Sequence, residues 1–353
     1  MKSKKNTTKV LVFIPTFNAV EDVKKLVSDI HKQSGDFEVS VLIIDSSTRI
    51  RPQKKLSKID NIDFVVIPSK EFSHGGTRAK AIDFAIKKGF DYIVFTVQDV
   101  QMYNDKWLEN IIEPFSIDTR VACVFGKQVP YEHHNPLSKS MMELAFKDMS
   151  PKGKLIIHKK GKKGDPGVYF NSHVNSAYKL KFFKDGIIKM PMMNYAEDQY
   201  MAKEIINNDL LKVYNPEACV YHSHAWSSAY EYFQRFFDEY RGLKESIGYY
   251  EKLGRKAVIK NAFRSGLKDS KLIMKYKSNI FRKLKWSLLA FPIELYKYLA
   301  IYFARRYKKI PQDIQNLFSR EDMQKNLNTN KLRSSLRLKA NLYLINSLLS
   351  NKL

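Results

Sequence analysis

The chain has 353 residues, 44% of them hydrophobic, so it can bury the core of one large α/β domain with an appendage, or of two domains. Its formal net charge of +25 predicts an anionic partner: a membrane surface, a phosphate-rich substrate or nucleic acid. We expect no nucleic acid, because the sequence has no zinc-finger spacing, aromatic RNA-binding signature or recognisable helix-turn-helix.

The cysteines and the N-terminal segment bear on the cellular compartment. Cys123 and Cys219 each lie in an apolar run, which predicts buried thiols in a reducing compartment rather than a disulfide framework. The first residues, M-K-S-K-K-N-T-T-K, lead into a predicted strand without the apolar core of a signal peptide. Nothing in this segment therefore directs the chain to secretion.

The first part of the chain alternates short β-branched or aromatic runs with segments of helical spacing. Strands are expected at 10–14, 39–44, 64–67, 92–97 and 121–125, and helices at 21–33, 77–88 and 105–115. Such alternation with short connections predicts βαβ units, hence an α/β fold with a mostly parallel sheet flanked by helices.

The pattern is lost between residues 128 and 166, which mix His, Pro, Met, Lys and Gly without clear periodicity. We expect a long loop there, either a basic cover for a phosphate-rich ligand or a solvated segment. Regular patterns then return, as a strand-like segment at 168–178, a helix at 197–207, strands at 211–214 and 218–221, and a helix at 227–240.

The C-terminal region from about residue 243 is basic and predicted to be α-helical. The apolar stretch within 280–309 is interrupted by Pro292, Glu294 and Lys297, so it does not read as a membrane-spanning helix. Two interpretations remain: an interfacial helix pair on an anionic membrane, or a helical subdomain that packs its own core. The same region is a candidate surface for a homodimer.

Four short motifs follow predicted strands, where ligands of open α/β sheets bind. These are Pro15–Phe17, Asp45, the turn His74–Arg78, and Gln98–Asp99. Asp99 at the end of a stiff strand can hold a divalent cation against a phosphate, or simply cap the next helix. The glycine pair of the turn can expose helix N–H groups to a diphosphate, or form an ordinary tight turn.

Two further motifs carry ionisable side chains. Glu197 and Asp198 open a predicted helix, where they can act as a general base or merely complement the helix dipole. His222 and His224 are two residues apart on an extended segment, so both can face one site. With Asp99, they form a thin ligand set of the kind that borrows further ligands from a substrate phosphate.

The ordered series P-T-F-N, I-I-D-S-S, E-F-S-H-G-G-T-R, T-V-Q-D, A-E-D-Q and V-Y-H-S-H resembles the motifs of inverting family 2 glycosyltransferases of the GT-A (Rossmann-like) fold. The likeness covers roughly residues 9 to 240. Within that family, H-G-G-T-R and Q-D look most like bacterial rhamnosyltransferases of surface polysaccharide synthesis.

The resemblance implies a role for each motif. Asp99 and His222 would hold Mg²⁺ or Mn²⁺, with His224 and Trp226 as additional neighbours. Asp198 would be the general base, and Glu197 would orient it or contact the acceptor. The nucleotide-sugar contacts would be Pro15, Thr16, Phe17, Asp45, Gly75, Gly76, Arg78 and Gln98.

The resemblance also implies separate functional regions along the chain. Residues 1–127 would bind the nucleotide sugar, and 128–242 would bind the acceptor and carry the base. Residues 243–353 lie beyond the resemblance, and their basic, partly apolar composition predicts association with the membrane. We therefore expect a peripheral enzyme on the cytoplasmic face of the membrane that acts on a lipid-linked or growing surface glycan. The alternatives are a sugar nucleotidyltransferase, which should carry a Gly-rich loop where P-T-F-N stands, and a non-catalytic membrane-associated assembly factor.

Overall fold

The computed structural model describes residues 7–51, 53–56, 59–160, 166–224 and 228–320. Within these ranges the chain forms two compact units, one of residues 7–132 and 142–223 and the other of residues 133–141 and 224–320. The sequence predicted functional divisions after residues 127 and 242. By compactness, the C-terminal part of the second unit starts at His224 and includes helix α8 (Ala229–Ser246).

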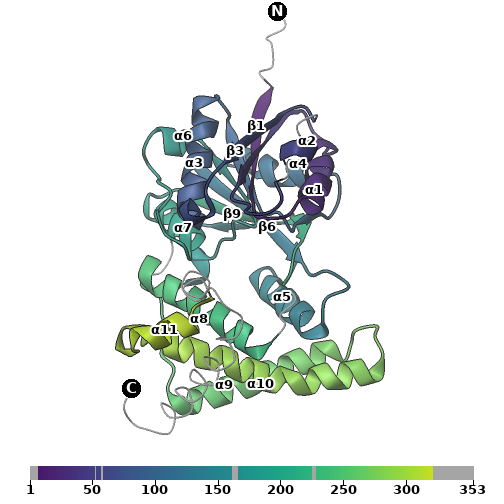
Figure 1. Ribbon diagram of the computed structural model, residues 1–353, viewed down its shortest axis with the longest axis vertical. Coiled ribbons are helices and arrows are strands. Elements are labelled where there is room, and N and C mark those ends of the chain that lie inside the picture. The colour runs from purple at the N-terminus through teal and green to yellow at the C-terminus, as the bar shows by residue number, and fades with distance from the viewer. Residues whose placement is uncertain (1–6, 52, 57–58, 161–165, 225–227, 321–353) are drawn as a thin grey trace, which may run out of the picture. The chain divides into compact units, whose positions relative to one another are not determined.

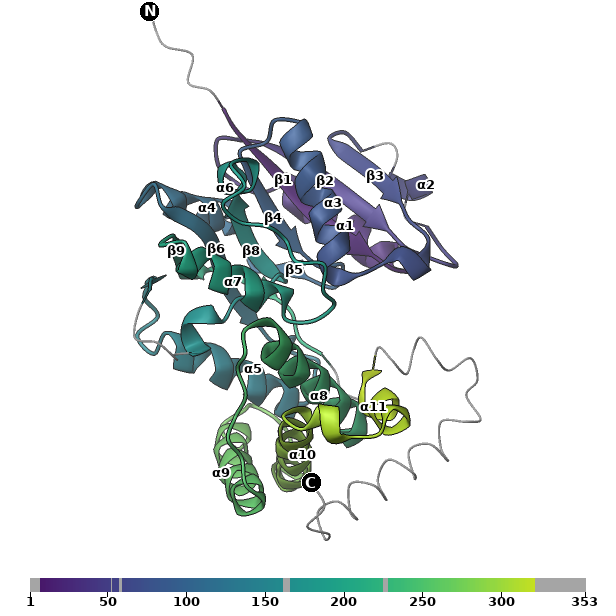
Figure 2. The same ribbon diagram turned by 90° about the vertical axis from the view of Figure 1, so that its left-hand side faces the viewer.

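A nine-stranded mixed sheet forms the centre of the first unit (Figure 1, Figure 2). Its strands are β1 (Thr8–Thr16), β2 (Phe37–Asp45), β3 (Ile62–Val66), β4 (Tyr92–Thr96), β5 (Gln101–Met102), β6 (Val121–Val129), β7 (Ile156–His158), β8 (Asn175–Lys179) and β9 (Leu211–Tyr221). They run in the order β3-β2-β1-β4-β8-β6-β9-β5, and β7 pairs with β9.

The parallel strands bring the predicted motifs to one edge of the sheet. Strand β1 lies parallel to β2 and β4, and Thr16 at the end of β1 stands beside Asp45 at the end of β2. The predicted parallel arrangement is thus confirmed for β1 to β4. Strand β8, part of the expected strand-like segment 168–178, runs antiparallel between β4 and β6, a direction and position that the strand–helix alternation did not predict.

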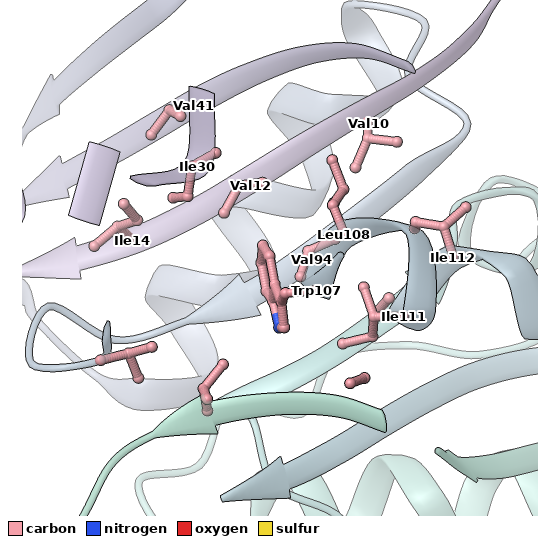
Figure 3. Packing of buried hydrophobic residues seen from close by; sticks show 14 of the residues in the cluster. Val10, Val12, Ile14, Ile30, Val41, Val94, Trp107, Leu108, Ile111 and Ile112 are labelled. Carbon is pink, nitrogen blue, oxygen red and sulfur yellow. The ribbon is translucent and has the colours of Figure 1, made fainter. Parts of the chain in front are cut away.

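Helices cover both faces of this sheet (Figure 1). One face carries α1 (Glu21–His31), α2 (Gln53–Leu56) and α4 (Trp107–Ile112), and the other carries α3 (His74–Lys87), α6 (Lys181–Lys184) and α7 (Glu197–Asn207). Because successive side chains of a strand point to opposite faces, Val10, Val12 and Ile14 of β1 pack with α1 and α4 (Figure 3). Leu11 and Phe13 of the same strand pack with α3 on the other face.

The second unit is helical and has its own core. It consists of α8, α9 (Arg255–Ile273), α10 (Ile280–Ala304), α11 (Gln312–Phe318) and the first residues of α5 (Pro136–Met149). Phe233 and Phe237 of α8 meet Phe318 of α11 edge to face, with ring centroids 4.9 and 5.4 Å apart. Across the described helices, none combines the length and the apolar character needed to cross a membrane.

Two sequence predictions about this part of the chain are wrong. The expected long loop at 128–166 contains α5, whose apolar residues face two ways: Leu137 packs with Ile273 and Ala290, whereas Phe146 packs with Phe125. A helix with two apolar faces shows no single period, which is why it was missed. The expected helix pair at 280–309 is one helix, α10, with Pro292 inside it.

Strand boundaries also differ from the predictions. Of the strand-like segment 168–178, only the part that begins at Asn175 pairs in the sheet. The two strands expected around Pro216 are one strand, β9, with an irregular register opposite Gly126. The two cysteines are buried and free, as the sequence predicted.

Candidate active site

The ends of β1 and β4 are joined by the side chain of Gln98. Its Oε1 accepts a hydrogen bond from the Phe17 backbone N–H at 2.7 Å, and its Nε2 donates to the Phe17 carbonyl at 3.4 Å. A carboxylate could accept the first bond but could not donate the second. The amide at this position therefore ties the loop after β1 to the residue that precedes Asp99.

Asp45 is fully buried at the end of β2, and its carboxylate is already engaged. Oδ1 accepts hydrogen bonds from the Thr16 hydroxyl at 3.0 Å and from the Ser47 N–H at 3.1 Å. Oδ2 forms an ion pair with Arg51 at 3.2 Å, and the Arg51 side chain is nearly half exposed. A nucleoside base that reached Asp45 would therefore also meet Arg51, a residue that the motifs did not point to.

Asn18 shapes the loop that follows β2. It adopts a left-handed backbone conformation with φ of 52°, and its side-chain oxygen accepts hydrogen bonds from the N–H groups of Thr48 at 3.2 Å and Arg49 at 3.0 Å. Asparagine tolerates this conformation better than most residues, because its short polar side chain bonds locally. A clue was present in P-T-F-N, where Asn lies two residues after the end of β1.

The glycine turn has a different role from the predicted diphosphate contact. Gly75 N–H donates to the Met193 carbonyl at 2.9 Å, and Gly76 N–H donates to the Ser73 hydroxyl at 3.1 Å. A side chain on Gly75 would place its Cβ 1.9 Å from the Pro191 carbonyl oxygen. These N–H groups are thus used by the protein itself, and Gly75 is needed because the segment before α7 crosses its backbone.

We expect Gly75→Ala to destabilise the protein by about 1–3 kcal/mol or more, since the added methyl group collides with backbone that cannot move freely. Chemical denaturation followed by circular dichroism measures this change. Gly254→Ala is the matched control, because a methyl group there meets nothing within 4 Å. Equal stability of the two variants would contradict the proposed backbone contact.

Glu197 forms a buried ion pair at the start of α7. Its Oε1 lies 3.0 Å from Arg78 Nη1, and both side chains are at most 8% exposed. The same oxygen accepts a hydrogen bond from His173 Nδ1 at 3.3 Å, while His173 Nε2 accepts one from the Tyr178 hydroxyl at 2.8 Å. Arg78 therefore holds Glu197, rather than standing open at the helix start as the sequence suggested.

Asp198 lies beside this ion pair and is half-buried. Its Oδ1 accepts a hydrogen bond from the Gln199 N–H at 2.9 Å, and its Oδ2 accepts one from the His173 N–H at 3.4 Å. The preceding residue, Ala196, has a left-handed φ of 54°, which is strained for alanine and typical of residues that position a functional group. The orientation of the two carboxylates is thus set by their surroundings.

The two neighbouring carboxylates differ in acidity. Burial and the negative charge of Glu197 raise the pKa of Asp198. Burial would also raise the pKa of Glu197, but Arg78 and the hydrogen bond from His173 outweigh it and lower that pKa. Glu197 is therefore a permanent anion paired with Arg78, whereas Asp198 is the carboxylate that can take up a proton near neutral pH.

His173 is a site residue that the sequence interpretation missed. Burial lowers its pKa to about 4, so the ring is neutral and can donate through Nδ1 while accepting through Nε2. Asn171 supports the same network by donating to the Tyr178 hydroxyl at 2.6 Å. The available signal was a polar residue at 171, 173 and 175, at intervals of two residues and ending at the first residue of β8.

Asp99 and His222 form the predicted metal pair, with His222 Nε2 3.9 Å from Asp99 Oδ2. His224, two residues along the same extended segment, offers a third ligand atom, and all three ligand atoms lie within 4.8 Å of one another. One carboxylate and two imidazoles suit Mn²⁺ and leave coordination positions for phosphate oxygens. The other predicted neighbour, Trp226, lies outside the described residues.

Gln128 orients the ligating histidine. Its Oε1 accepts a hydrogen bond from His222 Nδ1 at 2.8 Å, so the lone pair on Nε2 faces Asp99. Its Nε2 donates to the Ser172 hydroxyl at 2.9 Å. Since the N–H of the next residue, His173, bonds Asp198, a short hydrogen-bonded path joins the metal pair to the carboxylates of α7.

We expect Gln128→Leu to weaken Mn²⁺ binding by about 10- to 100-fold, because His222 loses the acceptor that fixes its tautomer. Gln128→Glu keeps an acceptor and should retain the affinity of the wild type. Calorimetric titration of Mn²⁺ into each variant measures the difference. Equal affinities of the Leu and Glu variants would show that Gln128 does not act through His222.

Comparison with known proteins identifies the family of this chain. Residues 11–187 match the family described as Glycosyl transferase family 2. The chain is 32% identical over 233 residues to the O-antigen chain rhamnosyltransferase RfbN of Salmonella typhimurium, which covers 65% of this chain and 71% of that protein. It is also 32% identical over 232 residues to the O-antigen chain rhamnosyltransferase WbaN of Salmonella anatum, covering 64% and 70%.

The fold has a solved counterpart. The mannosyltransferase PcManGT from Pyrobaculum calidifontis, determined in complex with GDP-Man and Mn²⁺, superposes with a TM-score of 0.55 at 13% identity, over 87% of this chain and 89% of that one. This likeness confirms the fold class expected from the motifs. The family match over half of the chain and the identity to both relatives together establish that this chain belongs to glycosyl transferase family 2 and is a glycosyltransferase.

Proposed function

We propose that the enzyme transfers rhamnose, with inversion, from a nucleotide-sugar donor to a lipid-linked or growing cell-surface glycan. The names of the two Salmonella relatives support the choice of sugar and of acceptor class. The observation that carries the mechanism is a path from His222 through the side chains of Gln128 and Ser172 to the backbone N–H of the next residue, His173, which donates to Asp198. It links the proposed cation site to the proposed base.

The donor would lie over the ends of β1 and β2. Pro15, Thr16 and Phe17 line the nucleoside side of this edge, and Asp45 with Arg51 can offer an acceptor and a donor to a base. Gln98 accepts a hydrogen bond from the Phe17 N–H and so positions the backbone next to the proposed nucleoside site. Gly75, Gly76 and Arg78 support the pocket indirectly, through the segment before α7 and through Glu197.

Asp99, His222 and His224 would hold Mn²⁺ or Mg²⁺ against the donor diphosphate. A bound cation would supply positive charge to the phosphate oxygens of the leaving group. The protein's own contribution is the fixed tautomer of His222 and the position of Asp99, whose carbonyl accepts a hydrogen bond from the Tyr131 hydroxyl at 2.7 Å.

Asp198 would act as the general base. Its carboxylate accepts the proton of an acceptor hydroxyl while that oxygen bonds to the anomeric carbon and the bond from this carbon to the diphosphate breaks. The donor leaves as a nucleoside diphosphate, and the configuration inverts because the attack comes from the opposite side. Glu197, held by Arg78 and His173, keeps its charge and raises the proton affinity of Asp198.

The place of action is also a proposal. The net charge of +25 and the basic second unit favour a peripheral position on the cytoplasmic face of the membrane, where a lipid-linked acceptor would be within reach. Membership of a glycosyltransferase family disfavours the alternatives of a sugar nucleotidyltransferase and a non-catalytic assembly factor.

A panel of nucleotide sugars tests the donor assignment. Purified protein with Mn²⁺ is screened by thermal shift, since a ligand that binds only the folded state raises the melting temperature. A nucleoside-diphosphate rhamnose should give the largest shift and should release nucleoside diphosphate when an acceptor glycan is added. A larger shift and faster turnover with another sugar would overturn the choice of rhamnose.

A further inference from the structure

Helix α9 exposes a row of large apolar side chains. Ile259, Phe263 and Leu267 follow each other at intervals of four residues, so they lie on one side of the helix. They are 67%, 57% and 39% exposed. Large apolar side chains of a small helical unit normally pack in its core. In α9 the buried positions are instead taken by smaller residues, such as Val258 and Ala262.

Helix α10 exposes a second row near its start. Phe281, Leu284 and Leu288 are spaced by three and four residues and are 78%, 47% and 71% exposed. The second half of α10 differs, because Leu299 to Ala304 are buried in the core of the second unit. Of the apolar stretch within 280–309, only the first half therefore exposes large apolar side chains that could contact a membrane.

The two rows share one surface of the α9–α10 hairpin. The rings of Phe263 and Phe291 lie 5.4 Å apart, and a Cβ on Gly266 would come within 2.8 Å of the Phe291 ring, so the helices meet closely here. Phe291 follows Leu288 by three residues and thus lies on the same side of α10. The hairpin surface is defined here as Ile259, Phe263, Leu267, Phe281, Leu284 and Leu288.

Basic side chains accompany this surface. The exposed cations of the two helices are Lys256, Lys260, Arg264, Lys268, Lys271, Arg282 and Lys285. The one acidic residue in the sequence between residues 255 and 293, Asp269, is buried and accepts a hydrogen bond from the Ser140 hydroxyl at 2.6 Å. The hairpin surface is therefore apolar with positive flanks.

The apolar side chains and positive flanks of the hairpin surface favour some binding partners over others. A second copy of the same surface would bring like charges together, which disfavours a homodimer. An anionic bilayer offers both an apolar interior for the Phe, Leu and Ile side chains and negative headgroups for the Lys and Arg side chains. Contiguous exposed apolar surface of this kind marks an interaction site in soluble proteins.

We propose that the hairpin surface docks onto an anionic lipid bilayer, with its apolar rows at the acyl boundary and its cations among the headgroups. The inference rests on the proposed function for the reason why the enzyme meets a membrane, namely an acceptor carried there. The surface itself is supported only by residues of the second unit. The inference also assigns the contact to α9 and the start of α10, rather than to the whole stretch 280–309.

Vesicle flotation of the full-length protein tests this proposal. The probes are phosphatidylcholine vesicles with and without phosphatidylglycerol, and the variant is Ile259→Ser/Phe263→Ser/Leu288→Ser. The matched control is Val66→Ser/Ile117→Ser/Ile157→Ser, which removes exposed apolar side chains from the first unit. Circular dichroism and light scattering of each protein report folding and oligomeric state.

The wild type and the control should float with the anionic vesicles only, and the hairpin variant should bind them at least about tenfold more weakly, because apolar burial is lost. Lys260→Glu/Arg264→Glu/Lys268→Glu should also lose binding, and salt should weaken the wild type. Flotation of the hairpin variant like wild type would overturn the proposal. A change in oligomeric state with unchanged flotation would overturn it in favour of a self-interface.

The thermal shift with nucleotide sugar distinguishes a failure of the membrane proposal from a failure of the donor assignment. The hairpin variant should show the same donor-induced shift as the wild type, since the altered residues belong to the second unit. A wild type that floats but responds to no nucleotide sugar would refute the donor assignment while supporting the membrane surface. A wild type that responds to donor but floats with neither vesicle would refute the membrane surface alone.

Discussion

Asp198→Asn is expected to reduce the turnover number by about 10²- to 10⁴-fold while leaving donor affinity nearly unchanged. An amide cannot accept the proton of the acceptor hydroxyl, but it keeps the shape of the side chain and can still accept the hydrogen bond from the Gln199 N–H. Steady-state kinetics with saturating donor and calorimetric titration of the donor measure the two quantities. Glu204→Gln, on the same helix, is the control and should retain wild-type turnover.

The direction of the change in stability caused by Asp198→Asn can also be predicted. Burial and Glu197 raise the pKa of Asp198 in the folded protein above that of an unfolded aspartate. The wild type therefore loses stability as the pH rises from the unfolded pKa toward the folded one, and asparagine avoids this loss. At neutral pH the melting temperature of Asp198→Asn should be at least that of the wild type. A lower value would mean that lost activity could reflect misfolding.

The pH dependence of turnover identifies the base more closely. If Asp198 must be ionised, activity rises as the pH increases through its raised pKa. Glu197→Gln removes the neighbouring negative charge, so the rise should move to lower pH in that variant. A profile that does not move would contradict the electrostatic coupling of the two carboxylates.

Loss of metal-dependent donor binding is the second large effect that we expect. Asp99→Ala and His222→Ala each remove one of the few protein ligands of the cation, so Mn²⁺ should no longer strengthen donor binding in either variant. Calorimetric titration of the donor with and without Mn²⁺ measures this coupling. Asp83→Ala, an exposed carboxylate of α3, serves as the control.

Removal of the metal should act in the same direction as these substitutions. Donor binding by the wild type in the presence of a chelator should resemble donor binding by Asp99→Ala, and the chelator should have little effect on the variant. If Asp99→Ala still gained affinity on addition of Mn²⁺, the cation would be held elsewhere. His224→Ala, which removes the third ligand atom, should also weaken the gain in donor affinity on addition of Mn²⁺.

The placement of the motifs could be predicted because buried parallel strands have a strong sequence signal. Val10–Ile14 and Tyr92–Val97 are apolar runs of strand length, and the polar residues that follow them had to meet at one sheet edge. The pairs Gln98–Phe17 and Thr16–Asp45 confirm that edge.

The partners of individual side chains could not be predicted in the same way. Arg78 looked available to a diphosphate, but it pairs with Glu197 from a helix more than a hundred residues later. His173 precedes β8, the antiparallel strand between β4 and β6, and Gln128 lies on β6 opposite Val220 of β9, two residues before His222. Contacts that depend on such strand pairing have no periodic signal.

The central claim is that the cation, the donor diphosphate and the base lie together at the carboxyl-terminal edge of the sheet. Diffraction from crystals containing Mn²⁺ and a nucleoside diphosphate, collected above the manganese absorption edge, tests it most directly. We predict an anomalous peak between the Asp99 carboxylate and His222 Nε2, with the diphosphate bound to the ion on the side of Asp198. An ion or a diphosphate bound away from this edge would contradict the account.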